Sequence, residues 1–346
     1  MDNYDNHDNG DDDFGYSLRP ETLNEFIGQE KAKEQLRIHI DAVKNRRATK
    51  SKRAAKSRDD VLEHVLLVGP PGLGKTTLAK IIANEFDTNF KQAIGPVMER
   101  IDLASTLTNL EEGDILFIDE IHRMKPTIQE SLYPVLEDFV LDLPLGQGPG
   151  SEVVQISLAP FTLVGATTRE GLLTGPFRSR LGINIHLDYY TAEDIQQAIR
   201  INSAKLNIKI EEEAEFALAL RARGTMRIAN KLLANIRDYA QVKGSGILTL
   251  EVVEEALKFF DIDEKGLNAQ DYAYFRVLIN NFNGRAGKKA LAVALSEDER
   301  TISEVYEPHY IKEGFLALTP SGRVATDAAY EYFGYPKSSQ PTLFEV

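Results

Sequence analysis

The stretch Gly69-Pro-Pro-Gly-Leu-Gly-Lys-Thr-Thr77 decides the fold of this chain. It follows the short apolar run His64-Val-Leu-Leu-Val68, which predicts a buried strand, and it precedes the helical pattern Leu78–Phe86. A strand, a glycine-rich loop and a helix in this order form the context that a phosphate-binding P-loop requires. The sequence therefore predicts an α/β domain with a parallel sheet and a nucleotide site where this helix begins.

The residue types in this loop suit phosphate chemistry. Gly69, Gly72 and Gly74 allow backbone N–H groups to surround phosphate oxygens with no Cβ in the way, and the helix N-terminus adds partial positive charge. Lys75 is placed to reach the β- and γ-phosphates, and Thr76 to put its hydroxyl on Mg²⁺. The alternative is a glycine turn that happens to carry a lysine, which the agreement of context and spacing disfavours.

A second motif, Ile115-Leu-Phe-Ile-Asp-Glu120, predicts another buried strand with two carboxylates at its end. Ligands of open parallel sheets bind at the carboxyl ends of strands. Asp119 is expected to help hold Mg²⁺, and Glu120 to polarise the water that attacks the γ-phosphate. A helix cap is the alternative for the pair, and the upstream P-loop makes it the weaker interpretation.

Two further polar positions follow a third apolar run, Phe161–Arg169. Thr168 is placed to sense the γ-phosphate or its water, although a threonine that caps a strand is the alternative. Arg178 and Arg180 follow at a turn after Pro176 and predict an arginine finger that reaches a neighbouring subunit's nucleotide. Taken alone, the two arginines would be ordinary surface charges.

Composition narrows the class of protein. The chain has 346 residues, 42% hydrophobic and 27% charged, which is enough for two or three domains with real cores. It has no cysteine, no apolar run of membrane-spanning length and an Asp/Asn-rich start unlike a signal peptide, so we expect a cytoplasmic protein. The net charge of −13 argues against a simple nucleic-acid coat, so any DNA contact needs a local basic face.

Changes in pattern divide the chain. The expected parts are a disordered acidic tail at 1–17, a large ATPase domain at 18–187 with an inserted β-hairpin at 141–158, a small helical lid domain at 188–263, a winged helix at 264–335 and a C-terminal tail at 336–346. The row Leu141, Leu143 and Leu145 predicts one apolar face of the hairpin, which suits a docking arm. The basic stretch Lys44–Arg58 fits a phosphate-binding patch and a solvated helix end equally well.

From Leu18-Arg-Pro to about Gly334 the chain resembles the RuvB family, AAA+ motors that drive branch migration of Holliday junctions in bacteria. The resemblance rests on the P-loop, Leu-Phe-Ile-Asp-Glu-Ile-His-Arg, Leu-Tyr-Pro-Val-Leu-Glu-Asp-Phe, Gly-Ala-Thr-Thr-Arg, Arg-Gly-Thr-Met-Arg-Ile-Ala-Asn and Gly-Arg-Val-Ala-Thr. It implies an ATPase and helicase-type translocase that forms hexameric rings on DNA and serves recombination, DNA repair and the SOS response to DNA damage.

The resemblance also implies roles for individual residues. Arg19 and Tyr190 would border the adenine pocket, Arg180 would be the trans-acting finger and Arg227 the second sensor. The implied nucleotide-binding residues, with ATP and Mg²⁺ as cofactors, are Leu18, Arg19, Gly72, Gly74, Lys75, Thr76, Thr77, Glu137, Asp138, Phe139, Arg180, Tyr190 and Arg227.

Implied partners are double-stranded DNA and Holliday junctions, RuvA through the hairpin 141–158, and RuvC in the resolving complex. The wing departs from the family, since Leu318 and Ser321 stand where basic residues are usual. DNA contact is therefore expected from Arg285, Lys288, Lys289, Arg300 and Arg323. The segment Gln340-Pro-Thr-Leu-Phe344 is similar to peptides that dock on the replicative sliding clamp.

Two other functions stay open at this point. A clamp-loader-type AAA+ subunit shares the P-loop and the finger, but it should lack the glycine-tipped hairpin and the winged helix. A DNA-binding scaffold with an inactive ATPase is disfavoured by the intact set of Lys75, Thr76, Asp119, Glu120 and Arg180.

Overall fold

A computed structural model describes residues 18–49, 60–97, 99–145 and 152–336 of the chain. The predictions for the acidic tail, the hairpin tip, residues 50–58 of the basic stretch Lys44–Arg58 and the segment Gln340–Phe344 lie outside the described residues. The chain divides into two compact units, Met1–Tyr189 and Tyr190–Val346.

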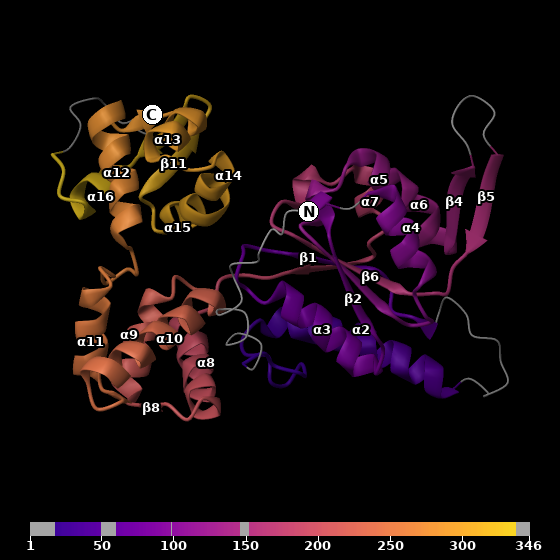
Figure 1. Ribbon diagram of the computed structural model, residues 1–346, viewed down its shortest axis with the longest axis horizontal. Helices are drawn as coiled ribbons and strands as arrows, with labels where there is room; N and C mark the ends of the chain where they lie inside the picture. The colour runs from indigo at the N-terminus through magenta and orange to yellow at the C-terminus, as the bar shows by residue number, and fades with distance from the viewer. Residues whose placement is uncertain (1–17, 50–59, 98, 146–151, 337–346) are drawn as a thin grey trace, which may run out of the picture. The chain divides into compact units, whose positions relative to one another are not determined.

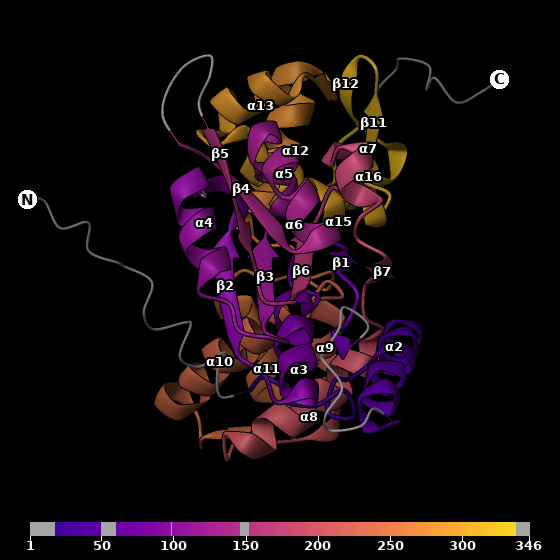
Figure 2. The ribbon, with the colours of Figure 1, turned by 90° about the vertical axis from the view of Figure 1, so that its right-hand side faces the viewer.

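The centre of the first unit is a five-stranded sheet in the order β2-β3-β6-β1-β7, which Figure 2 shows from one side. All four strand pairs are parallel. β3 and β6 are buried along almost their whole length, as expected for a parallel sheet that is covered on both faces. The strands are β1 Val65–Val68, β2 Phe90–Ile94, β3 Ile115–Asp119, β6 Thr162–Thr167 and β7 Ile183–His186.

Helices cover both faces of this sheet (Figure 1). On one side lie α2 and α3, and on the other lie α4, α5 and α6. The spacing of Ala32, Leu36, Ile40 and Val43 predicts an amphipathic helix over Lys31–Val43. This helix is present with these side chains buried, and it continues six residues further, to Thr49. The helix bounds are α2 Glu30–Thr49, α3 Lys75–Phe86, α4 Arg100–Thr108, α5 Pro126–Ser131, α6 Tyr133–Asp138 and the short α7 Gly175–Arg178.

The predicted hairpin is present as the antiparallel pair β4 (Val140–Leu145) and β5 (Glu152–Ser157). The row of leucines is predicted to form a free docking face, and this is wrong for Leu141. The side chain of Leu141 is only 3% exposed and is part of the core, and Leu143 packs against the same core. Val153, 58% exposed, lies on the solvent side instead. Alternation shows which residues share a face of a strand, but not whether that face points at the core.

The second unit begins with four helices, α8 Ala192–Lys205, α9 Glu212–Arg221, α10 Met226–Lys243 and α11 Leu250–Phe259. The side chains of Thr191, Thr225 and Thr249 cap α8, α10 and α11 by accepting the N–H of the third helical residue. The same part contains a small parallel sheet of two strands, β8 Lys209–Ile210 and β9 Ile247–Leu248.

The unit ends in the predicted winged helix. Helices α12 (Ala269–Phe282), α13 (Lys288–Leu295) and α16 (Asp327–Tyr332) surround a sheet in the order β10-β12-β11, with bounds Arg285–Ala286, Gly322–Ala325 and Leu316–Thr319. The sequence pattern predicts one helix over Thr301–Glu313. The structure has three consecutive elements there, namely α14 (Glu299–Thr301), a π-helical turn (Ile302–Tyr306) and α15 (Glu307–Lys312). Pro308 explains the irregular turn, because it has no N–H to donate to the preceding turn.

Among the helices of the described ranges, none has the length and apolar character needed to cross a membrane.

Candidate functional site

The carboxyl ends of three neighbouring strands form the candidate site. β1 pairs with β6 through Val68 and Thr167, and β6 pairs with β3 through Gly165 and Ile118. The N–H of Gly69 donates to the carbonyl of Thr167 at 3.1 Å, which fixes the start of the P-loop against β6. The P-loop, the acidic pair and Thr168 therefore lie at one edge of the sheet, where ligands of such sheets bind.

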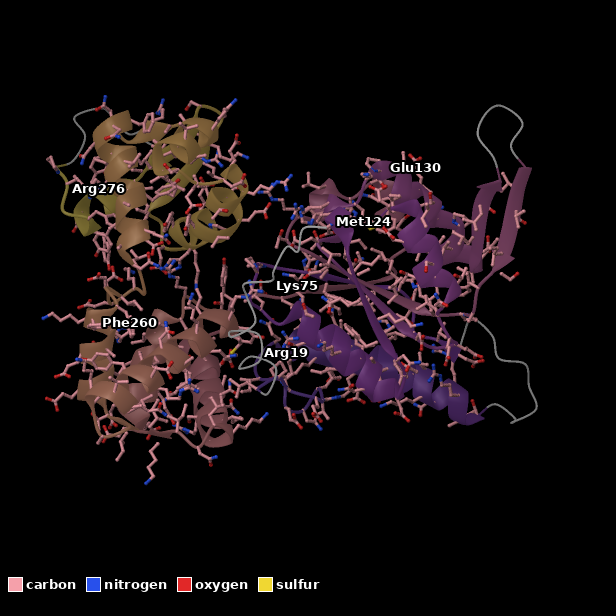
Figure 3. The ribbon with its side chains drawn as sticks, viewed as in Figure 1. Arg19, Lys75, Met124, Glu130, Phe260 and Arg276 are labelled. Carbon is pink, nitrogen blue, oxygen red and sulfur yellow. The ribbon has the colours of Figure 1, made fainter. Side chains whose placement is uncertain are left out.

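The P-loop passes directly into α3. Gly74 precedes the helix in the left-handed conformation (φ 92°), and at Gly69 a Cβ would lie 2.6 Å from the carbonyl oxygen of Leu187. Lys75, labelled in Figure 3, is 8% exposed, and its Nζ donates to the carbonyls of Gly69 (2.7 Å) and Pro70 (2.8 Å). The ammonium group is thus held over the loop beside the N–H groups of the first helical turn.

The acidic pair closes the other side of the site. Asp119 ends β3, and its Oδ1 accepts the N–H of Glu120 at 2.9 Å. Glu120 has φ 50°, an uncommon left-handed conformation for a residue with a side chain. Its carbonyl lies so close to Gly95 that a Cβ there would approach to 2.8 Å. Backbone strain of this kind costs about 1–3 kcal/mol. The same conformation occurs at helix ends of this chain, for example at Asp87 and Asn283, so it does not by itself mark a functional site.

Thr168 differs from its neighbour Thr167. The Oγ1 of Thr168 is buried and has no hydrogen-bond partner among the described residues. Thr167 is fully buried and its Oγ1 is bonded on two sides, to the N–H of Arg169 and to His122. A buried hydroxyl without a partner costs about 1–3 kcal/mol. Thr168 is therefore the hydroxyl of this edge that is ready to bond to a ligand.

Arg180 is held by three partners within its own chain. Its guanidinium lies 4.4 Å from the ring centroid of Tyr133, pairs with Glu137 at 3.0 Å and donates to the carbonyl of Pro176 at 2.6 Å. Arg178 instead makes a longer contact of 3.5 Å with Glu170. The structure therefore distinguishes the two candidate fingers, and sequence reasoning gave Tyr133 no role.

The segment that ends α6 has a mixed character. Glu137 and Asp138 are exposed, whereas Phe139 is 8% exposed and its ring packs against Phe161 at a centroid distance of 5.8 Å. The ring of Phe139 is thus part of the core. Nucleotide contacts by these three residues stay predictions.

The remaining predicted nucleotide residues are divided between the two units. Leu18, which is buried, and Arg19 belong to the first unit. Tyr190 and Arg227 belong to the second, where the N–H of Tyr190 donates to Gly224 and Arg227 is the exposed second residue of α10. The approach of Tyr190 and Arg227 to the P-loop stays a prediction.

The donor set fits Mg²⁺ only when a nucleotide is present. The described residues contain no group of three or more His, Asp or Glu side chains that could hold a metal ion by themselves. Mg²⁺ is usually bound by one or two protein oxygens together with substrate phosphates and water. The Asp119 carboxylate and the Thr76 hydroxyl supply such oxygens.

The predicted DNA-binding residues of the winged helix fall into two groups. Arg323 forms a two-pronged ion pair with the buried Glu307, at 2.7 and 2.9 Å, and Lys288 pairs with Glu299 at 3.2 Å. Arg285, Lys289 and Arg300 are exposed and form no ion pair with another described residue. Arg323 thus has a structural role, and its contribution to DNA binding stays a prediction.

Comparison with known proteins gives matches along most of the chain. The RuvB P-loop domain of the Holliday junction DNA helicase matches residues 18–187, the RuvB AAA lid domain 190–263 and the RuvB C-terminal winged helix domain 264–334. The Holliday junction branch migration complex subunit RuvB of Salinibacter ruber is 47% identical over 328 residues, which cover 94% of this chain and 92% of that protein.

Solved structures agree with these matches. The Thermotoga maritima RuvB Holliday junction branch migration motor has a TM-score of 0.82 and 42% identity, over 93% of this chain and 99% of that one. A point variant of Thermotoga maritima RuvB also has a TM-score of 0.82 and 42% identity, over 94% of this chain and 100% of that one.

Proposed function

The chain belongs to the RuvB family, and from this premise we propose how its residues drive branch migration of Holliday junctions with ATP. The fold is that of an AAA+ ATPase with a lid and a winged helix. One observation supports the proposal above all: the P-loop lysine, the two carboxylates and Thr168 lie together at the carboxyl end of the sheet. The buried hydroxyl of Thr168 has no partner among the described residues.

Binding of ATP replaces internal contacts with contacts to phosphate. The Lys75 ammonium leaves the carbonyls of Gly69 and Pro70 for the β- and γ-phosphates, and the first N–H groups of α3 bond to phosphate oxygens. Mg²⁺, held by Thr76 and Asp119, would neutralise charge that develops on the phosphates. Thr168 donates its hydroxyl to the γ-phosphate or to the attacking water.

Hydrolysis requires a base and a cation. Glu120 takes the proton of the attacking water, and its half-buried carboxylate, 26% exposed, stands at the strand end nearest that water. Arg180 leaves Glu137 and completes the site of the next subunit in a ring, a hexamer by family resemblance. Tyr190 and Arg227 of the second unit close on the adenine and the γ-phosphate, so the lid responds to the nucleotide state.

The partners follow from the exposed surfaces. Arg285, Lys289 and Arg300 offer charge to DNA phosphates, a contact independent of base sequence. RuvA docks on the solvent side of the hairpin, around Val153, and RuvC joins the resolving complex. This work takes place in the cytoplasm.

The test of the function is ATP-dependent dissociation of a synthetic four-way junction, with and without RuvA. We expect the wild-type protein to dissociate the junction only when ATP is present, and faster when RuvA is added. The Glu120→Gln variant should bind ATP but leave the junction intact. ATP hydrolysis without any junction dissociation, with RuvA present and rings formed, would contradict the motor function.

The hairpin has its own test. Val153→Asp should remove stimulation by RuvA and leave basal ATPase unchanged, because this side chain is 58% exposed outside the core. Ile38→Asp, at a β-branched position of α2 that is 59% exposed, is the matched control. Equal stimulation of both variants would place the RuvA contact elsewhere.

A further inference from the structure

A buried histidine connects the proposed base to strand β6. His122 lies in the short turn Ile121–Arg123 that follows Glu120, and its side chain is only 2% exposed. One ring nitrogen, Nδ1, lies 2.9 Å from Oγ1 of Thr167, and the other, Nε2, lies 3.6 Å from Oε2 of Glu120. The imidazole therefore stands between the base and the residue that precedes Thr168.

The contacts of Thr167 favour one direction for these bonds. Its Oγ1 already accepts the N–H of Arg169 at 2.9 Å, and Nδ1 of His122 lies within hydrogen-bond distance to accept its own proton. When the hydroxyl donates to Nδ1, the proton of the neutral imidazole is on Nε2. The N–H of Nε2 then faces the carboxylate of Glu120.

We propose that His122 is a positioning residue, which uses its Nε2–H to orient the Glu120 carboxylate and takes its own orientation from Thr167. This inference rests on the proposed role of Glu120 as the base. The present separation of 3.6 Å exceeds a hydrogen bond by about 0.6 Å, so the bond closes by a small rotation of the Glu120 side chain.

Thr167 makes this contact sensitive to the nucleotide. Its carbonyl accepts the N–H of Gly69 at the start of the P-loop, and it is bonded through the chain to Thr168. A phosphate that draws in the P-loop or Thr168 displaces Thr167, and the displacement reaches Glu120 through the imidazole.

The first test compares two amides at position 122. In His122→Gln the amide nitrogen reaches the place of Nε2 and can still donate to Glu120. In His122→Asn the side chain is too short for that, although its oxygen can still accept from Thr167. We expect His122→Asn to lower kcat about 10–100-fold with the KM for ATP within about twofold of wild type, and His122→Gln to recover most of the loss, since misplacement by about 1 Å costs up to ~10²-fold.

The second test changes the other end of the contact and does not depend on how the first variants fold. Thr167→Val keeps the buried volume and removes the hydroxyl, so it should lower kcat without raising KM. Thr167→Ser keeps the hydroxyl and should restore the rate. Binding of a fluorescent ATP analogue and the thermal unfolding midpoint are measured for every variant.

The outcomes separate the two levels of the proposal. The positioning role would be overturned if His122→Asn had the kcat of the wild type. It would also be overturned if His122→Asn and His122→Gln lost kcat equally and both had a raised KM for ATP. Equal rates in Thr167→Val and Thr167→Ser would overturn the coupling to β6. Glu120→Gln is the arm that tests the base itself, since wild-type hydrolysis by that variant would refute the proposed function before any statement about His122.

Discussion

Buried polar groups have different numbers of partners in two regions, the carboxyl end of the sheet in the first unit and the ion pairs of the second unit. At the carboxyl end of the sheet, the buried Thr168 hydroxyl has no partner among the described residues. In the second unit, Arg323 pairs with Glu307, and Arg223 pairs with Asp271 and also donates to the carbonyl of Gly266.

The difference in the number of partners distinguishes polar groups that hold the fold together from a group that can still bond to a ligand. Glu307 and Asp271 are 2% and 1% exposed, and each has an arginine partner and a tyrosine hydroxyl that donates to it, from Tyr274 and Tyr310. Fully satisfied charges of this kind hold a fold together and are costly to break. A missing partner alone does not mark a ligand site, because both ring nitrogens of the buried His309 also lack a hydrogen-bond partner among the described residues. Thr168 differs from His309 because it lies beside the P-loop at the carboxyl end of the sheet, where ligands of such sheets bind.

The largest expected effect concerns Arg180, the proposed arginine finger. In this structure Arg180 contacts residues of its own chain, whereas its proposed role is in the nucleotide site of another subunit. Arg180→Ala should lower ATP turnover about 10³–10⁵-fold, because the transition-state charge loses its cation. Mixing Arg180→Ala with Lys75→Ala subunits should restore some activity, since hybrid interfaces contain one intact site. No recovery at any ratio, with assembled rings demonstrated, would contradict a finger that acts in trans.

The next effect concerns the base. Glu120→Gln should lower kcat about 10²–10⁴-fold and retain ATP binding, because the water loses its base while the phosphate contacts stay. Lys75→Ala should instead weaken nucleotide binding, and equilibrium binding of a fluorescent ATP analogue separates the two. A Glu120→Gln variant that hydrolyses ATP at the wild-type rate would place the base elsewhere.

The third prediction breaks a satisfied pair in the winged helix. Arg323→Ala leaves the carboxylate of Glu307 buried without its cation and should destabilise the protein by about 3 kcal/mol, measured by denaturant unfolding. Arg285→Ala, on the adjacent strand β10, is the matched control and should change stability by less than about 0.5 kcal/mol. Equal stabilities would show that the Arg323 pair contributes little.

The fourth prediction uses a buried histidine of the same domain. Burial, together with the positive charges of Arg223 and Lys312, lowers the pKa of His309 from 6.5 to about 4, while Glu313 and Asp271 act in the opposite sense. Because the unfolded chain binds this proton first, stability is complete above pH 6.5 and falls as the pH drops toward 4, by about 2–3 kcal/mol. His309→Gln should flatten this part of the stability–pH curve, and an unchanged slope would assign it to other groups.

The smallest effect concerns DNA. Lys289→Ala and Arg300→Ala should each weaken DNA binding without sequence preference and reduce the slope of log K against log salt by about 1. Lys288→Ala, whose ammonium already pairs with Glu299, should change the slope less. Unchanged slopes in all three variants would move the footprint away from α13 and α14.

Local motifs predicted the P-loop and the strand that ends in Asp-Glu correctly, because each of these elements is defined by a few adjacent residues. The chemical roles assigned to their side chains stay predictions. The regular apolar periodicity of the second unit predicts helices over Ala192–Leu206, Glu211–Arg221, Arg227–Val242, Leu250–Phe260 and Ala269–Phe282. The four lid helices and α12 match these bounds to within one residue. β2, α4, β7 and α16 were missed. β2 carries the mixed sequence Phe-Lys-Gln-Ala-Ile and lies at the sheet edge, where alternation is weak.

By itself the sequence determined the fold class and the order of the parts, and it singled out Lys75, Asp119, Glu120 and Thr168 as candidate site residues, since each of these inferences depends on residues that are adjacent in the chain. Only the tertiary structure decided that Leu141 faces the core, that Arg323 is bound by Glu307 sixteen residues away and that His122 joins Glu120 to Thr167. The physical reason is that burial and pairing depend on which distant segment lies opposite a side chain, and no local pattern contains that information.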